Sequence, residues 1–119
     1  MKNIAPHIVR QRLLIEGYYS IELNREIIEK YLYGVAQHLA LKTYGKPVIY
    51  SPGGEGKEEN QGFDAFIPLI DSGISAYFWS KQRFFSILLY TCKHFDESAA
   101  IAFTQQFFAV ERETVHQSF

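Results

Sequence analysis

The sequence predicts an α+β fold, a two-layer α/β sandwich in which two helices cover one face of a mainly antiparallel sheet. Several strand-like runs follow one another with short polar connections, which favours antiparallel pairing. Two further stretches have apolar residues at helical spacing, each behind a residue able to cap a helix. No linker or internal repeat interrupts the chain, so residues 1–119 are expected to form a single domain.

The N-terminal part predicts a strand followed by a helix. The β-branched and aromatic content of residues 7–19 favours a strand, centred on Leu13–Tyr18. Asn24 is able to cap a helix, and Lys42 is expected in its last turn, with Gly45 and Pro47 ending it. The helical spacing is carried by Ile27, Ile28, Tyr31, Val35 and Leu39.

The rest of the chain predicts strands in series and then a second helix. Ser51–Gly62 is a polar loop, and Asp96 is expected to cap a helix over Glu97–Val110. The tail, Glu111–Phe119, is compatible with a last strand or with a frayed end. The expected strands are Pro47–Tyr50, Phe63–Ile70, Ile74–Trp79 and Phe84–Thr91.

Composition and charge exclude several classes of protein. With 47% hydrophobic residues the chain is too apolar for disorder. Its 13 acidic and 12 basic residues give no electrostatic reason to expect nucleic acid or an anionic membrane as a partner. Cys92 alone cannot form an intrachain disulfide, and neither a signal peptide nor an apolar run of membrane-spanning length is present. We therefore expect a soluble, cytoplasmic protein.

Two weaker motifs do not support a phosphate or metal site. The loop G-G-E-G-K at 53–57 lacks the spacing and the Ser or Thr of a phosphate-binding loop, and its glutamates would repel a phosphate. It is interpreted as a loop that could cover a site. The four histidines show no metal-ligand spacing, and Cys92 with His94 cannot complete a zinc shell. No metal ion is expected.

Three positions have residue types suited to chemistry. Ser72 lies in a D-S-G turn between two expected strands, where its hydroxyl would be well exposed. Cys92 ends the next apolar strand, although its residue type favours a buried structural cysteine. Glu16 follows the apolar run L-L-I and could bind a cationic ligand, but a strand end reaching water is the simpler interpretation.

The segment around Ser72 resembles a known family. D-S-G-I-S-A-Y-F-W-S-K at 71–81, followed by Y-T-C-K at 90–93, is similar to the E-S-H-I-S-I-H-T-W-P-E and F-T-C-G motifs of bacterial and archaeal S-adenosylmethionine decarboxylases. The spacing from Ser72 to Cys92 fits without a gap, and Trp79 falls in register. Upstream, H-I-V-R-Q-R-L-L-I-E-G-Y-Y resembles the opening strand of the family, so the resemblance covers nearly the whole chain.

The resemblance implies roles for individual residues. Members of the family cut their own chain before a serine, which becomes a pyruvoyl group that acts as an electron sink for loss of CO₂. Ser72 matches this serine, Asp71 replaces the preceding Glu, and Cys92 matches the proton-donating cysteine. Tyr77 stands where the processing His is expected, and Gly73 replaces the His after the serine.

These replacements predict a relative that does not process itself. A tyrosine phenol keeps its proton near neutral pH, where a histidine accepts one, so elimination at Ser72 should stall and no pyruvoyl cofactor should form. Tyr77, Trp79 and Glu16 are then expected to bind S-adenosylmethionine or a related small ligand. The matching position of the family's adenine-stacking aromatic is Glu58, for which Tyr50 could substitute.

Three functions remain open at this point. The first is an unprocessed relative that binds a ligand through its aromatic residues. Strand alternation alone would also explain these residues, because it places Phe78 on one face of the sheet and Tyr77 and Trp79 on the other. The second is an active decarboxylase of spermidine biosynthesis, in which another group replaces the missing His and Ser72 supplies the pyruvoyl. The third is a non-catalytic partner or regulator that acts through its sheet. The resemblance also implies a homodimer.

Overall fold

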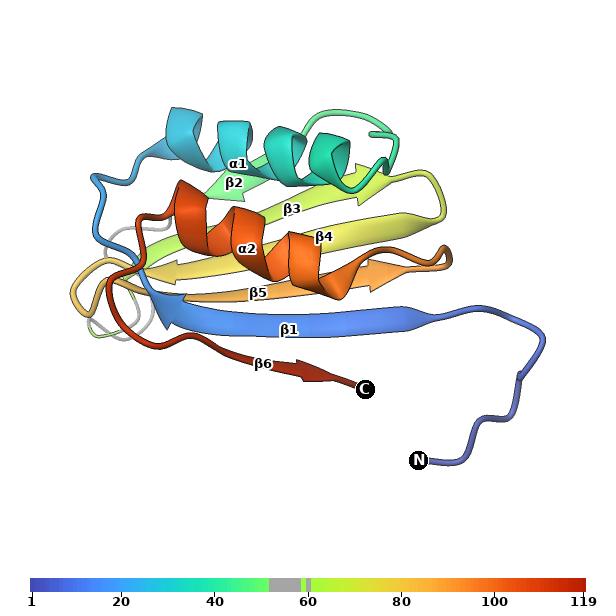
Figure 1. The fold of residues 1–119 in the computed structure, drawn as a ribbon. Helices are drawn as coiled ribbons and strands as arrows, with labels where there is room; N and C mark the ends of the chain where they lie inside the picture. The colour runs from blue at the N-terminus through green and yellow to red at the C-terminus, as the bar shows by residue number, and fades with distance from the viewer. Residues whose placement is uncertain (52–58, 60) are drawn as a thin grey trace.

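The computed structural model describes residues 1–51, 59 and 61–119 and confirms the predicted α+β fold. The six-stranded sheet has the order β2-β3-β4-β5-β1-β6, and all of its neighbouring strands are antiparallel. Both helices lie over the same face of this sheet (Figure 1). The elements are β1 Gln11–Tyr18, α1 Arg25–His38, β2 Val48–Tyr50, β3 Gly62–Leu69, β4 Ser72–Trp79, β5 Phe84–Thr91, α2 Glu97–Phe107 and β6 Val115–Ser118.

The predicted loop motif at 53–57 and Glu58 lie outside the described residues. The tail forms β6, so the first of its two interpretations is confirmed. Both predicted caps are also confirmed: the side chain of Asn24 accepts a hydrogen bond from the N–H of Ile27, and that of Asp96 from the N–H of Ala99. The residues that start the helices are therefore readable from sequence.

The first helix ends earlier than expected, and the prediction that it extends to Lys42 is wrong. Ala40 adopts the left-handed conformation, with φ of 57°. Its N–H donates to Gln37 O, and the N–H of Leu41 donates to Ala36 O. These two bonds form a Schellman motif, which satisfies the last carbonyls and turns the chain away.

The second helix ends in the same way, so the predicted end at Val110 is also wrong. Ala109 has φ of 48°, and its N–H donates to Gln106 O. The N–H of Val110 donates to Gln105 O, which completes a second Schellman motif. Alanine at these positions gives no sequence signal, because glycine is the usual residue there.

One face of the sheet makes the core with the helices. Phe108 follows α2 and is fully buried. Its ring centroid lies 4.6–5.6 Å from the ring centroids of Tyr31, Phe78 and Phe85. The buried sheet residues alternate along each strand, as a half-buried sheet requires. They include Leu13, Ile15, Ala65, Ile67, Leu69, Ile74, Ala76, Phe78, Phe85, Ile87 and Leu89.

The opposite face has no helix over it in the part of the chain described, and we call it the open face. Large apolar side chains remain partly exposed there, which is unusual for a surface that meets only water. Tyr77, for example, is 41% exposed while its neighbour Phe78 is 2% exposed, which confirms the predicted alternation. The exposed apolar residues of this face are Val48, Tyr50, Phe66, Tyr77, Tyr90, Val115 and Phe119.

Candidate functional site

The turn between β3 and β4 holds the peptide bond before Ser72. Leu69 pairs with Ser72, so Ile70 and Asp71 form the turn, and Asp71 has a positive φ of 61°. The N–H of Cys92 donates to the carbonyl of Asp71 at 3.0 Å. Asp71, Ser72 and Cys92 are therefore brought together at one end of the sheet.

Ser72 is the first residue of β4, and the prediction that its hydroxyl is well exposed is wrong. Its partners in register are Leu69 and Thr91, both buried, which places the Ser72 side chain toward the helix layer. The Ser72 Oγ is buried and has no hydrogen-bond partner among the described residues. Strand pairing begins at Ser72 itself, so the pleat and not the turn directs its side chain.

Cys92 is exposed, so the residue-type prediction of a buried structural cysteine is wrong. It lies just after β5 and opposite Asp71, beyond the last buried position of the strand, Thr91. Its thiol is therefore available on the surface beside the Asp71–Ser72 peptide.

Tyr77 and Trp79 do not meet Ser72 within one chain. Their register places both on the open face, whereas the side chain of Ser72 points toward the helices. At roughly 3.3 Å per residue, Tyr77 lies about 16 Å and Trp79 about 23 Å from Ser72 along β4. Proton transfer requires hydrogen-bond reach, so Tyr77 cannot act on Ser72 of its own chain.

Glu16 and Tyr77 lie in one polar row on the open face. Glu16 pairs with Ser86, Ser86 with Tyr77, and Tyr77 with Asp64. The Ser86 Oγ donates a 2.7 Å hydrogen bond to the carboxylate of Glu16. Glu16 thus lies within β1, and its interpretation as a strand end is wrong; its carboxylate is held beside the centre of the open face.

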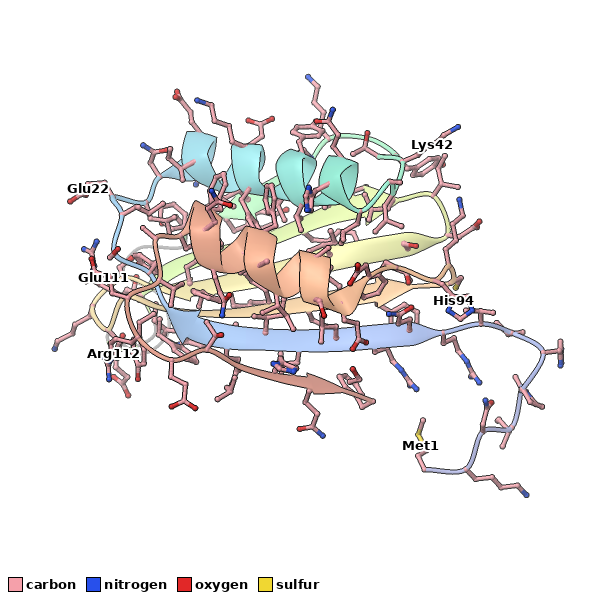
Figure 2. The ribbon with its side chains drawn as sticks, in the orientation of Figure 1. Met1, Glu22, Lys42, His94, Glu111 and Arg112 are labelled. Atoms are coloured by element: carbon pink, nitrogen blue, oxygen red, sulfur yellow. The ribbon has the colours of Figure 1, made fainter. Side chains whose placement is uncertain are left out.

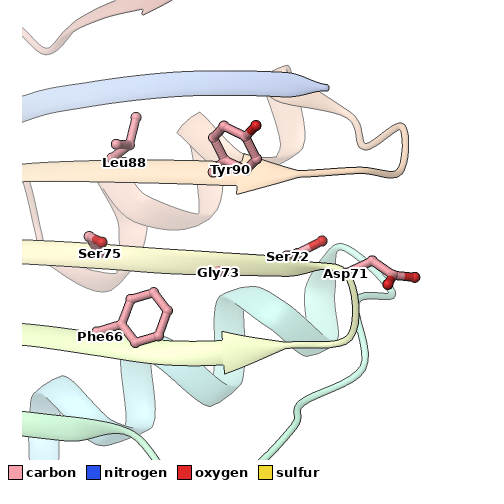
Figure 3. Close-up of a pocket in the computed structure, with 7 residues that line it drawn as sticks. All are labelled: Phe66, Asp71, Ser72, Gly73, Ser75, Leu88 and Tyr90. Atoms are coloured by element: carbon pink, nitrogen blue, oxygen red, sulfur yellow. The ribbon is translucent and has the colours of Figure 1, made fainter. Parts of the chain in front are cut away.

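A pocket of about 370 Å³ opens beside Ser72 on the open face. Its walls come from β3 and β5, and its floor from β4 (Figure 3). Its aromatic wall could not be predicted from the sequence, because Phe66 is one of several aromatic residues in the expected strands. The lining residues are Phe66, Asp71, Ser72, Gly73, Ser75, Leu88 and Tyr90.

Neither a metal site nor a membrane-spanning helix is found in the part of the chain described. No group of three or more His, Cys, Asp or Glu side chains is placed to hold an ion among those residues. None of the helices there is both long and apolar enough to cross a membrane.

The fold and this site define a class of small α+β domains with a serine at a strand start and a cysteine opposite the preceding carbonyl. The sequence model of the family described as S-adenosylmethionine decarboxylase matches residues 12–119. The chain therefore belongs to the S-adenosylmethionine decarboxylase family. The solved adenosylmethionine decarboxylase of Aquifex aeolicus VF5 has the same fold, with a TM-score of 0.71 at 18% identity over 94% of this chain and 89% of that chain. No curated protein matches in a sequence search.

Proposed function

We propose that this protein is an S-adenosylmethionine decarboxylase-like protein that does not process itself and that binds S-adenosylmethionine or a related ligand on its open face. The observation that carries the proposal is the separation of Ser72 from Tyr77 within one chain. The Ser72 Oγ is buried on the helix side, and Tyr77, which replaces the family's histidine, lies on the other side of the same strand. These residues do not fit formation of a pyruvoyl group.

The open face offers the chemistry that a cationic ligand needs. S-Adenosylmethionine carries a sulfonium and an ammonium group, which carboxylates and aromatic faces attract. Glu16 supplies a carboxylate that is fixed by Ser86, and Tyr77 lies in the same row. Trp79 lies one row further along, with its ring 5.2 Å from that of Phe84. The predicted binding residues thus share one face.

A second copy of the chain is the proposed cover of this face. The exposed apolar side chains of the open face resemble the core of a homodimer interface. If two open faces packed together with their β4 strands running in opposite directions, Tyr77 of one copy would lie toward the Ser72 end of the other copy. Within one chain, Tyr77 and Ser72 lie too far apart along β4 to meet. The ligand would then lie between the two sheets.

Titration calorimetry with S-adenosylmethionine tests the binding. We expect one site per chain, and the Glu16→Gln variant should bind about tenfold more weakly, because one charge-assisted contact is lost. Glu29→Gln, on the exposed side of α1, is the matched control and should bind like the wild type. Absence of binding to the wild type would contradict the proposal and favour a non-catalytic partner.

An active pyruvoyl-dependent decarboxylase of spermidine biosynthesis is the second candidate, and one observation favours it. His94 is exposed just after Cys92, at the end of the sheet where β5 ends (Figure 2). An imidazole there could replace the missing histidine as a base. If so, the purified chain would be cut before Ser72, and His94→Ala would remain intact.

A further inference from the structure

A second cleft, of about 480 Å³, lies at the end of the sheet away from Ser72. Three connections meet there: the segment after β1, the turn between β4 and β5, and the segment between α2 and β6 (Figure 1). The N–H of Tyr19 donates to Arg83 O at 2.9 Å, which joins the first connection to the second. The N–H of Ser20 donates to Phe108 O at 3.1 Å, which joins it to the end of α2. The cleft is lined by Tyr18, Tyr19, Ser20, Arg83, Glu111 and Arg112, among others.

Two arginines of this cleft are each held over a tyrosine ring. The Arg112 Cζ lies 4.1 Å from the centroid of the Tyr18 ring. The Arg83 Cζ lies 5.3 Å from the centroid of the Tyr19 ring, and its Nη2 donates a 2.7 Å hydrogen bond to Ile21 O. Among the described residues Arg83 has only this hydrogen bond and Arg112 has none, so most of their N–H donors remain for a ligand. Holding the cations in place beforehand lowers the entropy cost of binding.

The charges of the cleft favour an anion. Two guanidinium groups face one carboxylate, that of Glu111, which precedes Arg112 on the connection to β6 (Figure 2). In the part of the chain described, no ion pair neutralises Arg83 or Arg112. The lining is therefore net positive, although the formal net charge of the whole chain is -1.

A phosphate group matches this pair of arginines better than a carboxylate does. A guanidinium donates two parallel N–H bonds to the oxygens of a phosphate or a carboxylate. A phosphomonoester has three acceptor oxygens and a charge near -2 at neutral pH, so it can bind two guanidinium groups at once. A carboxylate has two oxygens and a single charge, which one guanidinium satisfies.

We propose that this cleft binds a phosphate group, carried by a small phosphomonoester or by inorganic phosphate. Arg83 and Arg112 are the binding residues, and Tyr18 is a positioning residue that holds Arg112. Glu111 lowers the affinity by repulsion. The site goes beyond the proposed function, because none of these residues is among those proposed to bind S-adenosylmethionine.

Amide chemical shifts of the full chain at constant ionic strength test the proposal, with inorganic phosphate, glycerol phosphate and acetate as probes. Both phosphates should shift the amide signals of Ser20, Arg83 and Arg112, with dissociation constants in the millimolar range. Acetate should bind about tenfold more weakly, because it has less charge and fewer acceptors. Tighter binding of glycerol phosphate would support an organic phosphate as the ligand, and tighter binding of inorganic phosphate would support the free ion.

Charge variants on either side of the cleft should act in opposite directions. Arg83→Gln and Arg112→Gln should each weaken both phosphates roughly tenfold, because charge-assisted hydrogen bonds are lost. Glu111→Gln should strengthen them about two- to fivefold, because repulsion is removed. Lys30→Gln, at an exposed position of α1, changes the net charge as Arg112→Gln does and should leave the affinities unchanged.

Two variants of Tyr18 test its role in holding Arg112. Tyr18→Leu removes the ring beside the guanidinium and should weaken both phosphates about threefold, whereas Tyr18→Phe keeps the ring and should bind like the wild type. Amides of Ser20 and Arg83 that stay unshifted by either phosphate would overturn the proposal. So would acetate that binds as tightly as the phosphates, or equal weakening by Lys30→Gln and Arg112→Gln.

Discussion

The two faces of the same sheet differ sharply, although the same strands make both. On β4, Ile74 and Ala76 are fully buried under the helices, while Tyr77 between Ala76 and Phe78 is 41% exposed. The helix-covered face is a closed apolar core, in which the polar side chains of Tyr31 and Thr104 bond to each other. The open face carries aromatic rings, the polar row that contains Glu16 and Tyr77, and a pocket. The buried core thus lies on one face, and the proposed ligand-binding residues lie on the other.

The largest contrast is expected from matched truncations on the two faces. Phe108→Ala removes a buried ring that contacts Tyr31, Phe78 and Phe85, so it should cost about 3–5 kcal/mol of the free energy of unfolding. Tyr77→Ala on the open face should cost roughly 1 kcal/mol or less. Urea denaturation of both variants checks the difference. Similar losses would contradict the separation of the two faces.

A charge on the open face should break self-association without unfolding the chain. Leu14→Lys places an ammonium group beside Leu88 in the middle of this face. An unpaired charge that loses its water costs about 3 kcal/mol or more, so the dimer should weaken at least roughly a hundredfold. Analytical ultracentrifugation measures this, with Glu29→Lys on α1 as the control. A wild type that stays monomeric at high concentration would contradict the proposed dimer.

The buried phenol of Tyr31 should make the core sensitive to alkali. Burial raises the pKa of Tyr31, so above about pH 10 the unfolded chain releases this proton before the folded chain does. The contribution of the protonated Tyr31 phenol to the free energy of unfolding is complete below that pH. It is lost as the pH rises, by about 1.4 kcal/mol per pH unit. Tyr31→Phe should flatten the decline of stability between pH 10 and 11. An unchanged slope would contradict this assignment.

The smallest expected effect comes from the helix ends. Ala109→Gly relieves a left-handed alanine and should raise stability by about 0.5–1 kcal/mol. Ala102→Gly, at an exposed position inside α2, should lower it by a similar amount. Thermal denaturation should show a higher Tm for Ala109→Gly and a lower Tm for Ala102→Gly. A lower Tm for both variants would contradict the Schellman motif at Ala109.

The fold could be predicted further than the site. Periodicity and capping residues such as Asn24 depend on local chemistry, which the sequence records directly. The helix ends at Ala40 and Ala109 could not be predicted, because alanine there is tolerated by the surrounding structure and not favoured locally. The start of pairing at Ser72 is likewise set by its partners Leu69 and Thr91.

The candidate site shows the same division. The family motif picks out Ser72 and Cys92, and the pairing of β4 with β5 brings them to one end of the sheet. Tyr77 and Trp79 seemed adjacent to Ser72 in the motif, yet strand length and pleat separate them from it. The contact between Phe66 and Gly73 joins the neighbouring strands β3 and β4 and leaves no pattern in the sequence.

The intact mass of the purified chain tests the central claim most directly, since the claim is that Ser72 stays uncut. We predict one species near the full mass of 13.8 kDa, unchanged on prolonged incubation and matching Ser72→Ala apart from the lost oxygen. Two fragments divided between Asp71 and Ser72, with the second one beginning in a pyruvoyl group, would contradict it and identify a working self-processing enzyme.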